Sequence, residues 1–164
     1  MNIYMIDESP RVVAKSVSDD VWERRLFDAV ELVSEGAAHW EGEESMFICH
    51  DPKHSWVGWV KKSKFNWGWA VKYLAYLVPE LEGRGYTVSD EISSFADYIN
   101  GEYGFTPTIR TIPPRCVPRE FKESDASIPN TIESYRGFVR SVPRLHKMGR
   151  QSPAWLEKME VCND

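Results

Sequence analysis

Residues 55–81 read SWVGWVKKSKFNWGWAVKYLAYLVPEL, and this stretch decides the fold. Its apolar residues return at every third or fourth position, which is the period of an α-helix and not the alternation of a strand. The stripe consists of Trp56, Val60, Trp67, Ala70, Leu74, Leu77 and Leu81, with Ser63 as a polar interruption. We therefore predict one long helix that ends within the Pro- and Gly-containing stretch 79–85.

The faces beside this stripe carry further rings and several positive charges. They hold Trp59, Asn66, Trp69, Tyr73 and Tyr76 together with Lys61, Lys62, Lys64 and Lys72. Two interpretations fit the pattern. An aromatic stripe at helical spacing is most often a core element. Rings that alternate with small polar groups near a cationic end also form the wall of a site for a flat, anionic ligand.

Capping residues, prolines and glycines on both sides of this stretch predict further helices. They are expected over 10–17, 18–36, 87–100, 130–143 and 152–159. The apolar run 3–6 is either a lone strand or an ordered arm, and the proline-rich segment 102–129 is a binding loop or an arm across the helices. The predicted fold class is mostly α: residues 1–164 form a single domain of five or six helices with one long Pro-rich irregular segment.

Composition agrees with a packed globule, because 42% of the 164 residues are hydrophobic and 13% are aromatic. No apolar run reaches the roughly 20 residues of a membrane helix, and the start MNIYMIDESP lacks the features of a signal peptide. We expect a soluble cytoplasmic protein without a membrane partner. Cys49, Cys116 and Cys162 lack metal-type spacing and are expected to be free thiols.

The net charge of −5 conceals a segregation along the chain. Residues 1–44 carry eleven acids against four bases, whereas residues 51–72 carry five bases against one acid and residues 110–150 nine bases against four acids. Two arrangements remain open. The basic segments either form a positive face opposite an acidic back, or they neutralise the acidic segment across the globule.

Residues 49–54 contain possible ligands and proton carriers: Cys49, His50, Asp51 and His54. These side chains could bind zinc or iron, but no second ligand pair with CxxC or HxxxH spacing accompanies them, so we assign no metal. His54 is a candidate general acid or base because imidazole titrates near neutral pH. The alternative role is a buried, hydrogen-bonded histidine.

Polar groups on the helices supply further candidates. Arg24, Arg25 and Asp28 could orient a substrate phosphate with Asp28 as a base, or they could form an ordinary surface ion pair. Ser63 and Asn66 lie three residues apart on the aromatic helix, where an amide can read a nucleobase edge and a Trp face can stack on it.

A late helix contributes Tyr135, Arg136 and Arg140, which either clamp a phosphate or only solvate the helix. Walker, GxGxxG, GxSxG and HExxH motifs do not occur in the sequence. ATP-driven chemistry, dinucleotide redox and the common hydrolases therefore lose support, and we expect no cofactor.

The order of several motifs adds a resemblance to known families. Asp19 and Asp20 precede RRLFDAVELVS, and WVKKSKFNWGW, ESYRGFV and PAWL follow. This order resembles a family of small helical proteins of tailed phages and, more distantly, the pyrimidine-dimer DNA glycosylases. The resemblance spans most of the chain at scattered positions. It implies site residues at Arg24, Asp28, His54, Trp59, Ser63, Asn66, Trp69, Tyr135 and Arg136.

Some positions depart from the family pattern. Asp20 and Val21 stand where the family has lysine and histidine, and Asp28 stands where it has glutamate. The glycosylases use an N-terminal amine as nucleophile beside a helix carboxylate. Here Asn2 is a bulky second residue that leaves Met1 in place. We therefore do not predict that imine chemistry from the resemblance.

The leading hypothesis is a phage-encoded protein that modifies or excises bases of nucleic acids or nucleotides, with DNA or a nucleotide as its partner. Asp28 and His54 would move protons. The substrate would be held by Arg24, Arg25, Trp59, Lys62, Ser63, Asn66, Trp69, Tyr135 and Arg136. The alternative is a non-catalytic interaction protein that binds a host enzyme or defence factor through the acidic segment 1–44, which includes EGEES at 41–45.

Overall fold

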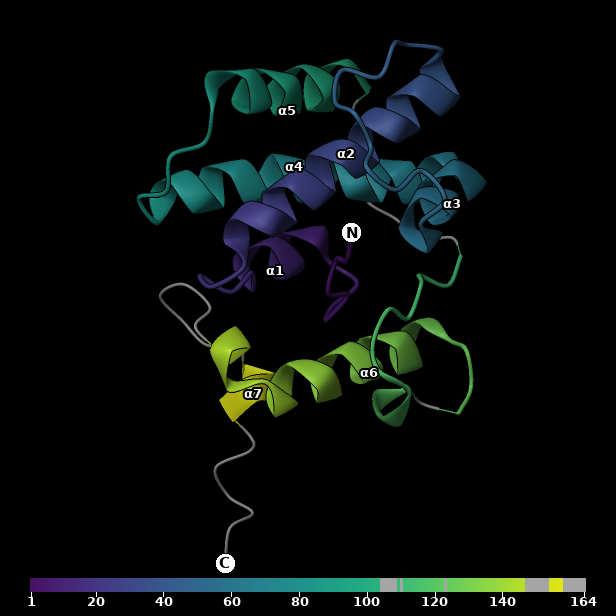
Figure 1. Cartoon of the computed structure of the whole chain (residues 1–164), viewed down its shortest axis with the longest axis vertical. Helices are drawn as coiled ribbons and strands as arrows, with labels where there is room; N and C mark the ends of the chain where they lie inside the picture. Colours follow the sequence, from purple (N-terminus) through teal and green to yellow (C-terminus); the bar gives the residue numbers. More distant parts are fainter. Residues whose placement is uncertain (104–108, 110, 123, 147–153, 158–164) are drawn as a thin grey trace, which may run out of the picture.

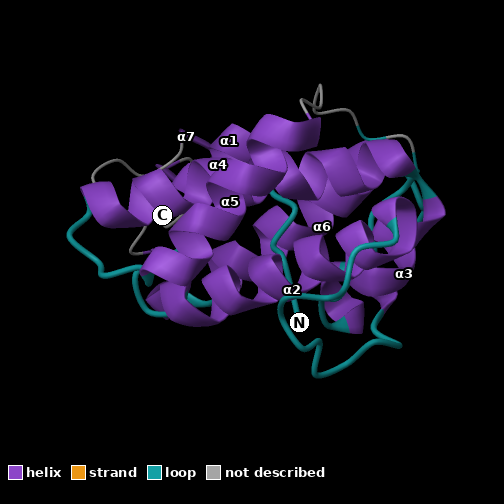
Figure 2. Cartoon of the chain, turned by 90° about the horizontal axis from the view of Figure 1, so that it is seen from above, coloured by secondary structure: helices purple, strands orange, loops and turns teal. Residues whose placement is uncertain are grey.

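Helix α4, Lys64–Gly83, is the centre of the helical packing in the computed structural model of the protein (Figure 1). It is contacted by α1, Pro10–Lys15; α2, Trp22–Glu41; α3, Ser55–Lys62; and α5, Asp90–Tyr103. The structure describes residues 1–103, 109, 111–122, 124–146 and 154–157, and in this part of the chain every regular element is helical (Figure 2). The prediction of a mostly α single domain of five or six helices is confirmed: five described helices have seven or more residues and α1 has six, whereas α7 is a single turn of four.

The helix predicted over 55–81 is in fact two helices, α3, Ser55–Lys62, and α4. Ser63 separates them with an extended backbone, φ −154° and ψ 131°, and its hydroxyl accepts a hydrogen bond from the Phe65 amide at 3.2 Å. A serine side chain satisfies an amide that the first helical turn leaves unpaired, so it favours a helix start. The residue that interrupts the apolar stripe is therefore where the chain turns.

The bounds of α2, Trp22–Glu41, differ from the predicted 18–36. The helix ends at Gly42, whose φ of 71° lies in the left-handed region that favours glycine. Gly36, the predicted stop, lies inside the helix, where a Cβ atom would come within 2.1 Å of Trp67 Cδ1. Glycine is needed there for close packing of α2 on α4, not for ending the helix.

The other predicted helices are present with shifted ends. They are α1, Pro10–Lys15; α5, Asp90–Tyr103; α6, Ile128–Ser141; and α7, Ala154–Glu157. The sequence predicts that Thr87 and Asn130 cap α5 and α6, but the caps are Ser89 and Ser127, whose hydroxyls accept from the amides of Ile92 and Asn130. Ser152, Pro153 and Met159 of the last predicted helix lie outside the described residues.

The two ends of the predicted segment 102–129 belong to α5 and α6. Its other described residues are irregular, apart from the 3₁₀ turn η1, Arg119–Phe121. A second 3₁₀ turn, η2, Pro143–His146, follows α6. Cys49 and Cys116 are free thiols, as predicted, and Cys162 lies outside the described residues. None of the described helices combines the length and the apolar character that crossing a membrane requires.

The N-terminal run is an ordered arm and not a strand. The arm, residues 1–6, passes between α2 and α6 (Figure 1). Ile3, Met5 and Ile6 are fully or almost fully buried. Buried apolar side chains of this size contribute about 1.5–3 kcal/mol each, so the arm is part of the core. This burial fixes where the N-terminal amine lies.

Candidate functional site

An open pocket of about 540 Å³ lies beside the N-terminus, between α2 and the loop that precedes α3. It is lined by Met1, Glu23, Arg24, Phe27, Asp28, Glu31, His50 and Asp51. The five α2 residues recur at the three- and four-residue spacing of one helix face. The volume is typical of a site for a small molecule or a single group of a larger one.

Asp28 forms the buried floor of this pocket and is only 7% exposed. Its Oδ2 accepts a hydrogen bond from the Asn2 amide at 2.8 Å and another from Arg25 Nη1 at 2.8 Å. The N-terminal amine of Met1 lies 3.7 Å from Oδ1. A carboxylate this deep is stable as an anion only when cations and donors surround it. Asp28 has both.

The arm brings the amine to Asp28 because Asn2 is held from three directions. Arg25 Nη1 donates to the Asn2 carbonyl, and Asn2 Nδ2 donates to the Cys116 carbonyl at 3.0 Å. The Tyr135 hydroxyl contacts Asn2 Oδ1 at 3.4 Å and donates to the Pro114 carbonyl at 2.8 Å. Helix α2, helix α6 and the proline-rich segment thus converge on the second residue of the chain.

His54 caps the start of α3, since its Nδ1 accepts from the Trp56 amide at 3.2 Å. Burial and then the positive N-terminal amine lower the pKa of His54, against smaller opposing effects of Asp51 and Asp28. The ring is therefore neutral at neutral pH, with its proton on Nε2. His54 does not line the pocket, but its charge state is coupled to the amine there.

This coupling predicts a pH-dependent stability. The folded-state pKa of His54 lies below its ordinary value of 6.5, so the folded protein resists protonation that the unfolded chain accepts. The stabilisation is complete above pH 6.5 and is lost as the pH falls below it. The variant His54→Asn keeps a capping side chain but has no imidazole to protonate. We expect its free energy of unfolding in urea to fall less than that of the wild type when the pH is lowered from 7.5 to about 5.5. An unchanged pH slope in this variant would contradict the assignment, and the exposed His39→Asn is the control.

The aromatic side chains proposed to receive a base lie in the core. Trp59 and Trp69 are buried, and their rings meet edge to face with centroids 6.0 Å apart. Their Nε1 groups donate to the carbonyls of Thr111 and Glu8 at 3.0 and 2.7 Å. Of the two interpretations of the aromatic stripe, the core element is the one the structure shows, because the neighbouring arm and loops cover both rings.

Asn66 is fully buried as well, and it does not face the pocket. Its Nδ2 donates to the Trp59 carbonyl at 2.9 Å and to Thr111 Oγ1 at 2.7 Å. The amide therefore ties the start of α4 to the end of α3 and to the proline-rich segment. Ser63 is used as a helix cap, and Lys62 is exposed at the end of α3, outside the pocket lining.

Tyr135 and Arg136 hold the N-terminal arm in this structure. Tyr135 is fully buried. Arg136 Nε donates to the Ile6 carbonyl at 2.8 Å, and its guanidinium pairs with Glu133 at 2.7 Å and with Asp7 at 3.5 Å. Arg136 lines a different open pocket, of about 330 Å³. Arg24, Arg25 and Asp28 thus come together with the amine, while Arg136 lies apart.

Two lysines of the cationic segment 51–72 form internal ion pairs with acidic residues of α2. Lys61 pairs with Glu35 at 2.7 Å, and Lys64 pairs with Glu41 at 2.5 Å. Basic residues of α3 and α4 thereby meet acidic residues of α2. Where the charges are described, this favours mutual neutralisation over a continuous positive face, so affinity for a polyanion has to come from individual exposed cations.

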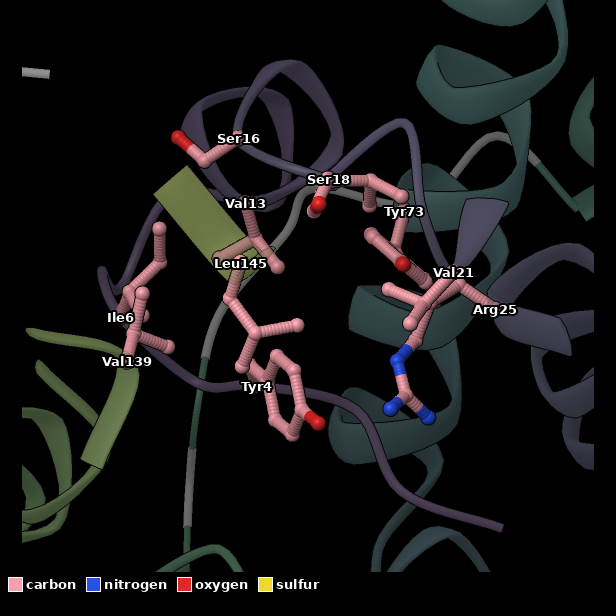
Figure 3. A pocket seen from close by; sticks show the side chains of 11 residues that line it. Tyr4, Ile6, Val13, Ser16, Ser18, Val21, Arg25, Tyr73, Val139 and Leu145 are labelled. Atoms are coloured by element: carbon pink, nitrogen blue, oxygen red, sulfur yellow. The ribbon is translucent and has the colours of Figure 1, made fainter. Parts of the chain in front are cut away.

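Arg25 also lines a separate, closed cavity, shown in Figure 3. Its volume is about 10 Å³, enough for roughly one water molecule and too small for a substrate. Tyr4, Tyr73 and Ser18 are among the residues that line it, and the Arg25 guanidinium carbon lies 4.3 Å from the centroid of the Tyr4 ring. Arg25 therefore has a structural role, because its side chain holds α2 against the arm.

The sequence-based prediction set the N-terminal amine aside and did not include Phe27 and Glu31. Helical spacing from Arg24 and Asp28 would have found the two side chains, because positions 24, 27, 28 and 31 share one face. His50, considered as a metal ligand, contacts Glu31 through Nδ1 at 2.5 Å. In the described part of the chain, His, Cys, Asp and Glu do not form a group that could hold a metal ion.

Comparisons with protein-family models, with curated proteins and with solved structures find no match. The function of the protein is therefore inferred from the groups at the pocket: a primary amine, a buried carboxylate, an exposed ring and an exposed arginine.

Proposed function

We propose that this protein acts on nucleic acid bases, and that it excises a base by attack of its N-terminal amine on the sugar carbon that carries the base. The observation that supports the proposal is the Met1 amine, 3.7 Å from the buried Asp28 carboxylate at an open pocket. An amine activated by an adjacent base is a common nucleophile for carbon centres of this kind. The resemblance to phage proteins and DNA glycosylases points to the same substrate class.

The reaction balances with the groups present. Asp28 first accepts a proton from the positively charged amine of Met1. The neutral nitrogen then bonds to C1′ of the sugar as the bond from C1′ to the base breaks, and the base leaves with that electron pair and takes the proton from Asp28. The nitrogen passes a further proton to Asp28, and this proton moves to the ring oxygen O4′ as the sugar ring opens, which leaves a protonated imine. Water then hydrolyses the imine and restores the amine. Asp28 is the carboxylate beside the nucleophile that accepts and returns protons.

Retention of Met1 is compatible with this chemistry. The bulky Asn2 leaves Met1 in place, which argued against the imine when only the sequence was considered. A retained Met1 still ends in a primary amine, and its side chain is almost completely buried. Burial of that side chain positions the nitrogen and reduces the number of orientations that it samples.

Borohydride trapping tests the proposal. Sodium borohydride reduces an imine to a stable amine, so the wild type should form a covalent adduct with an oligonucleotide that contains an abasic site. We expect peptide mapping to place the adduct on the α-amine of Met1. A short N-terminal extension moves the amine out of the pocket and should abolish trapping. An adduct found only on lysine side chains, or no adduct, would refute amine catalysis.

A second candidate function, non-catalytic binding to a host protein, is favoured by the acidic loop after α2. Met46 and Ile48 in this loop are 54% and 83% exposed. Glu43 is held in place by the hydroxyls of Tyr98 and Tyr103 at 3.0 and 2.5 Å. An ordered loop that presents apolar side chains beside carboxylates is typical of a binding surface. Failure of trapping by the wild type would make this candidate the better one.

A further inference from the structure

Phe27 is the apolar aromatic ring that the pocket exposes, together with the imidazole of His50. It lies on α2 between Arg24 and Asp28, lines the pocket, and is 48% exposed. The tryptophans of α3 and α4 are all buried, so their ring faces pack against other residues and are not open to a base. An exposed ring at the edge of a pocket offers a face for stacking, and stacking on an aromatic side chain is worth about 1–3 kcal/mol per base.

The charges around Phe27 restrict what can enter. Four carboxylates line the pocket, those of Glu23, Asp28, Glu31 and Asp51; its cations are the Arg24 guanidinium and the Met1 amine, which together with Arg25 compensates Asp28. A phosphate inside the pocket would be repelled by the carboxylates, whereas a neutral base would not. Arg24 is exposed, so it can meet a phosphate outside the pocket. The arrangement suits a nucleotide that enters base first.

Duplex DNA fits this arrangement poorly. Its two strands carry about one negative charge per 1.7 Å of helix axis, and its bases are stacked and paired, so that Phe27 could reach none of their faces. The base of a nucleotide in a single strand is unpaired, so it can reach Phe27 without the free energy needed to unpair and unstack a base of a duplex. Two of the lysines in the basic segment 51–72, Lys61 and Lys64, are already paired with acidic residues of α2 and are less available to a duplex.

We infer that the pocket takes one unpaired nucleotide of a single-stranded nucleic acid, with its base stacked on Phe27 and its phosphate at Arg24. This rests on the proposed function and names its substrate class and its specificity residue. Phe27 is a binding residue and takes no part in proton transfer.

Fluorescence binding with a single-stranded oligonucleotide that contains 2-aminopurine tests this inference at low salt. We expect the Kd of Phe27→Ala to rise about tenfold, as loss of roughly 1.4 kcal/mol of stacking predicts. Phe27→Trp should restore binding. Phe65→Ala is the matched control, because Phe65 is equally exposed, at 49%, and does not line the pocket. Its Kd should stay within about twofold of the wild type.

The outcomes separate the inference from the proposed function. Equal Kd values for Phe27→Ala and Phe65→Ala would overturn the stacking inference, even if the wild type traps an abasic site. Tighter binding of the matching duplex than of the single strand would overturn the choice of substrate. Absence of trapping combined with a selective effect of Phe27→Ala would refute the amine chemistry and leave the stacking site supported.

Discussion

Asp28→Asn is expected to lower the free energy of unfolding by about 3–5 kcal/mol, because it leaves a buried cation without its counterion. Arg25 is 6% exposed, and its Nη1 loses a charged acceptor at 2.8 Å. The Met1 amine loses its ion pair at the same time. Urea unfolding monitored by tryptophan fluorescence measures the change, since several tryptophans are buried.

Glu23→Gln is the matched control for this substitution. Glu23 carries the same charge and lines the same pocket, but it is exposed, so its removal should change stability by less than about 0.5 kcal/mol. A loss of less than about 1 kcal/mol in Asp28→Asn would mean that water reaches Arg25 and compensates it. That result would contradict the assignment of Asp28 as a buried counterion at the floor of the pocket.

Gly36→Ala is the second substitution with a large expected effect, a loss of about 2–3 kcal/mol through overpacking. The added Cβ would lie 2.1 Å from Trp67 Cδ1 and 2.4 Å from Nε1. Trp67 cannot move aside easily, because it is fully buried and its Nε1 donates to the Val33 carbonyl at 3.0 Å. The clash therefore outweighs the gain of up to about 1 kcal/mol that alanine gives a helix over glycine. Urea unfolding measures the difference.

Gly58→Ala should have the opposite sign. Gly58 lies inside α3, and a Cβ there would meet no atom of the described structure within 4 Å. The variant should gain up to about 1 kcal/mol from helix propensity alone. If Gly36→Ala and Gly58→Ala changed the free energy of unfolding in the same direction, close packing of α2 on Trp67 would not explain why position 36 needs glycine.

The helices could be predicted from the sequence because their apolar periodicity and caps are local features. The division of 55–81 into two helices could have been predicted too, since Ser63 is both the interruption of the stripe and a good N-cap. Gly36 was misread as a helix stop, because the pattern alone does not distinguish a glycine that ends a helix from one that admits a neighbouring ring.

For the candidate site, the sequence by itself determined that Arg24 and Asp28 share one helix face, because helical spacing dictates it. Only the tertiary structure decided that Trp59 and Trp69 are sealed in the core and that Phe27 is open. It also brought the N-terminal amine to Asp28. The physical reason is that burial and long-range pairing depend on which surfaces meet. The arm gains stability by burying its apolar residues between α2 and α6, and this packing carries the amine to the pocket.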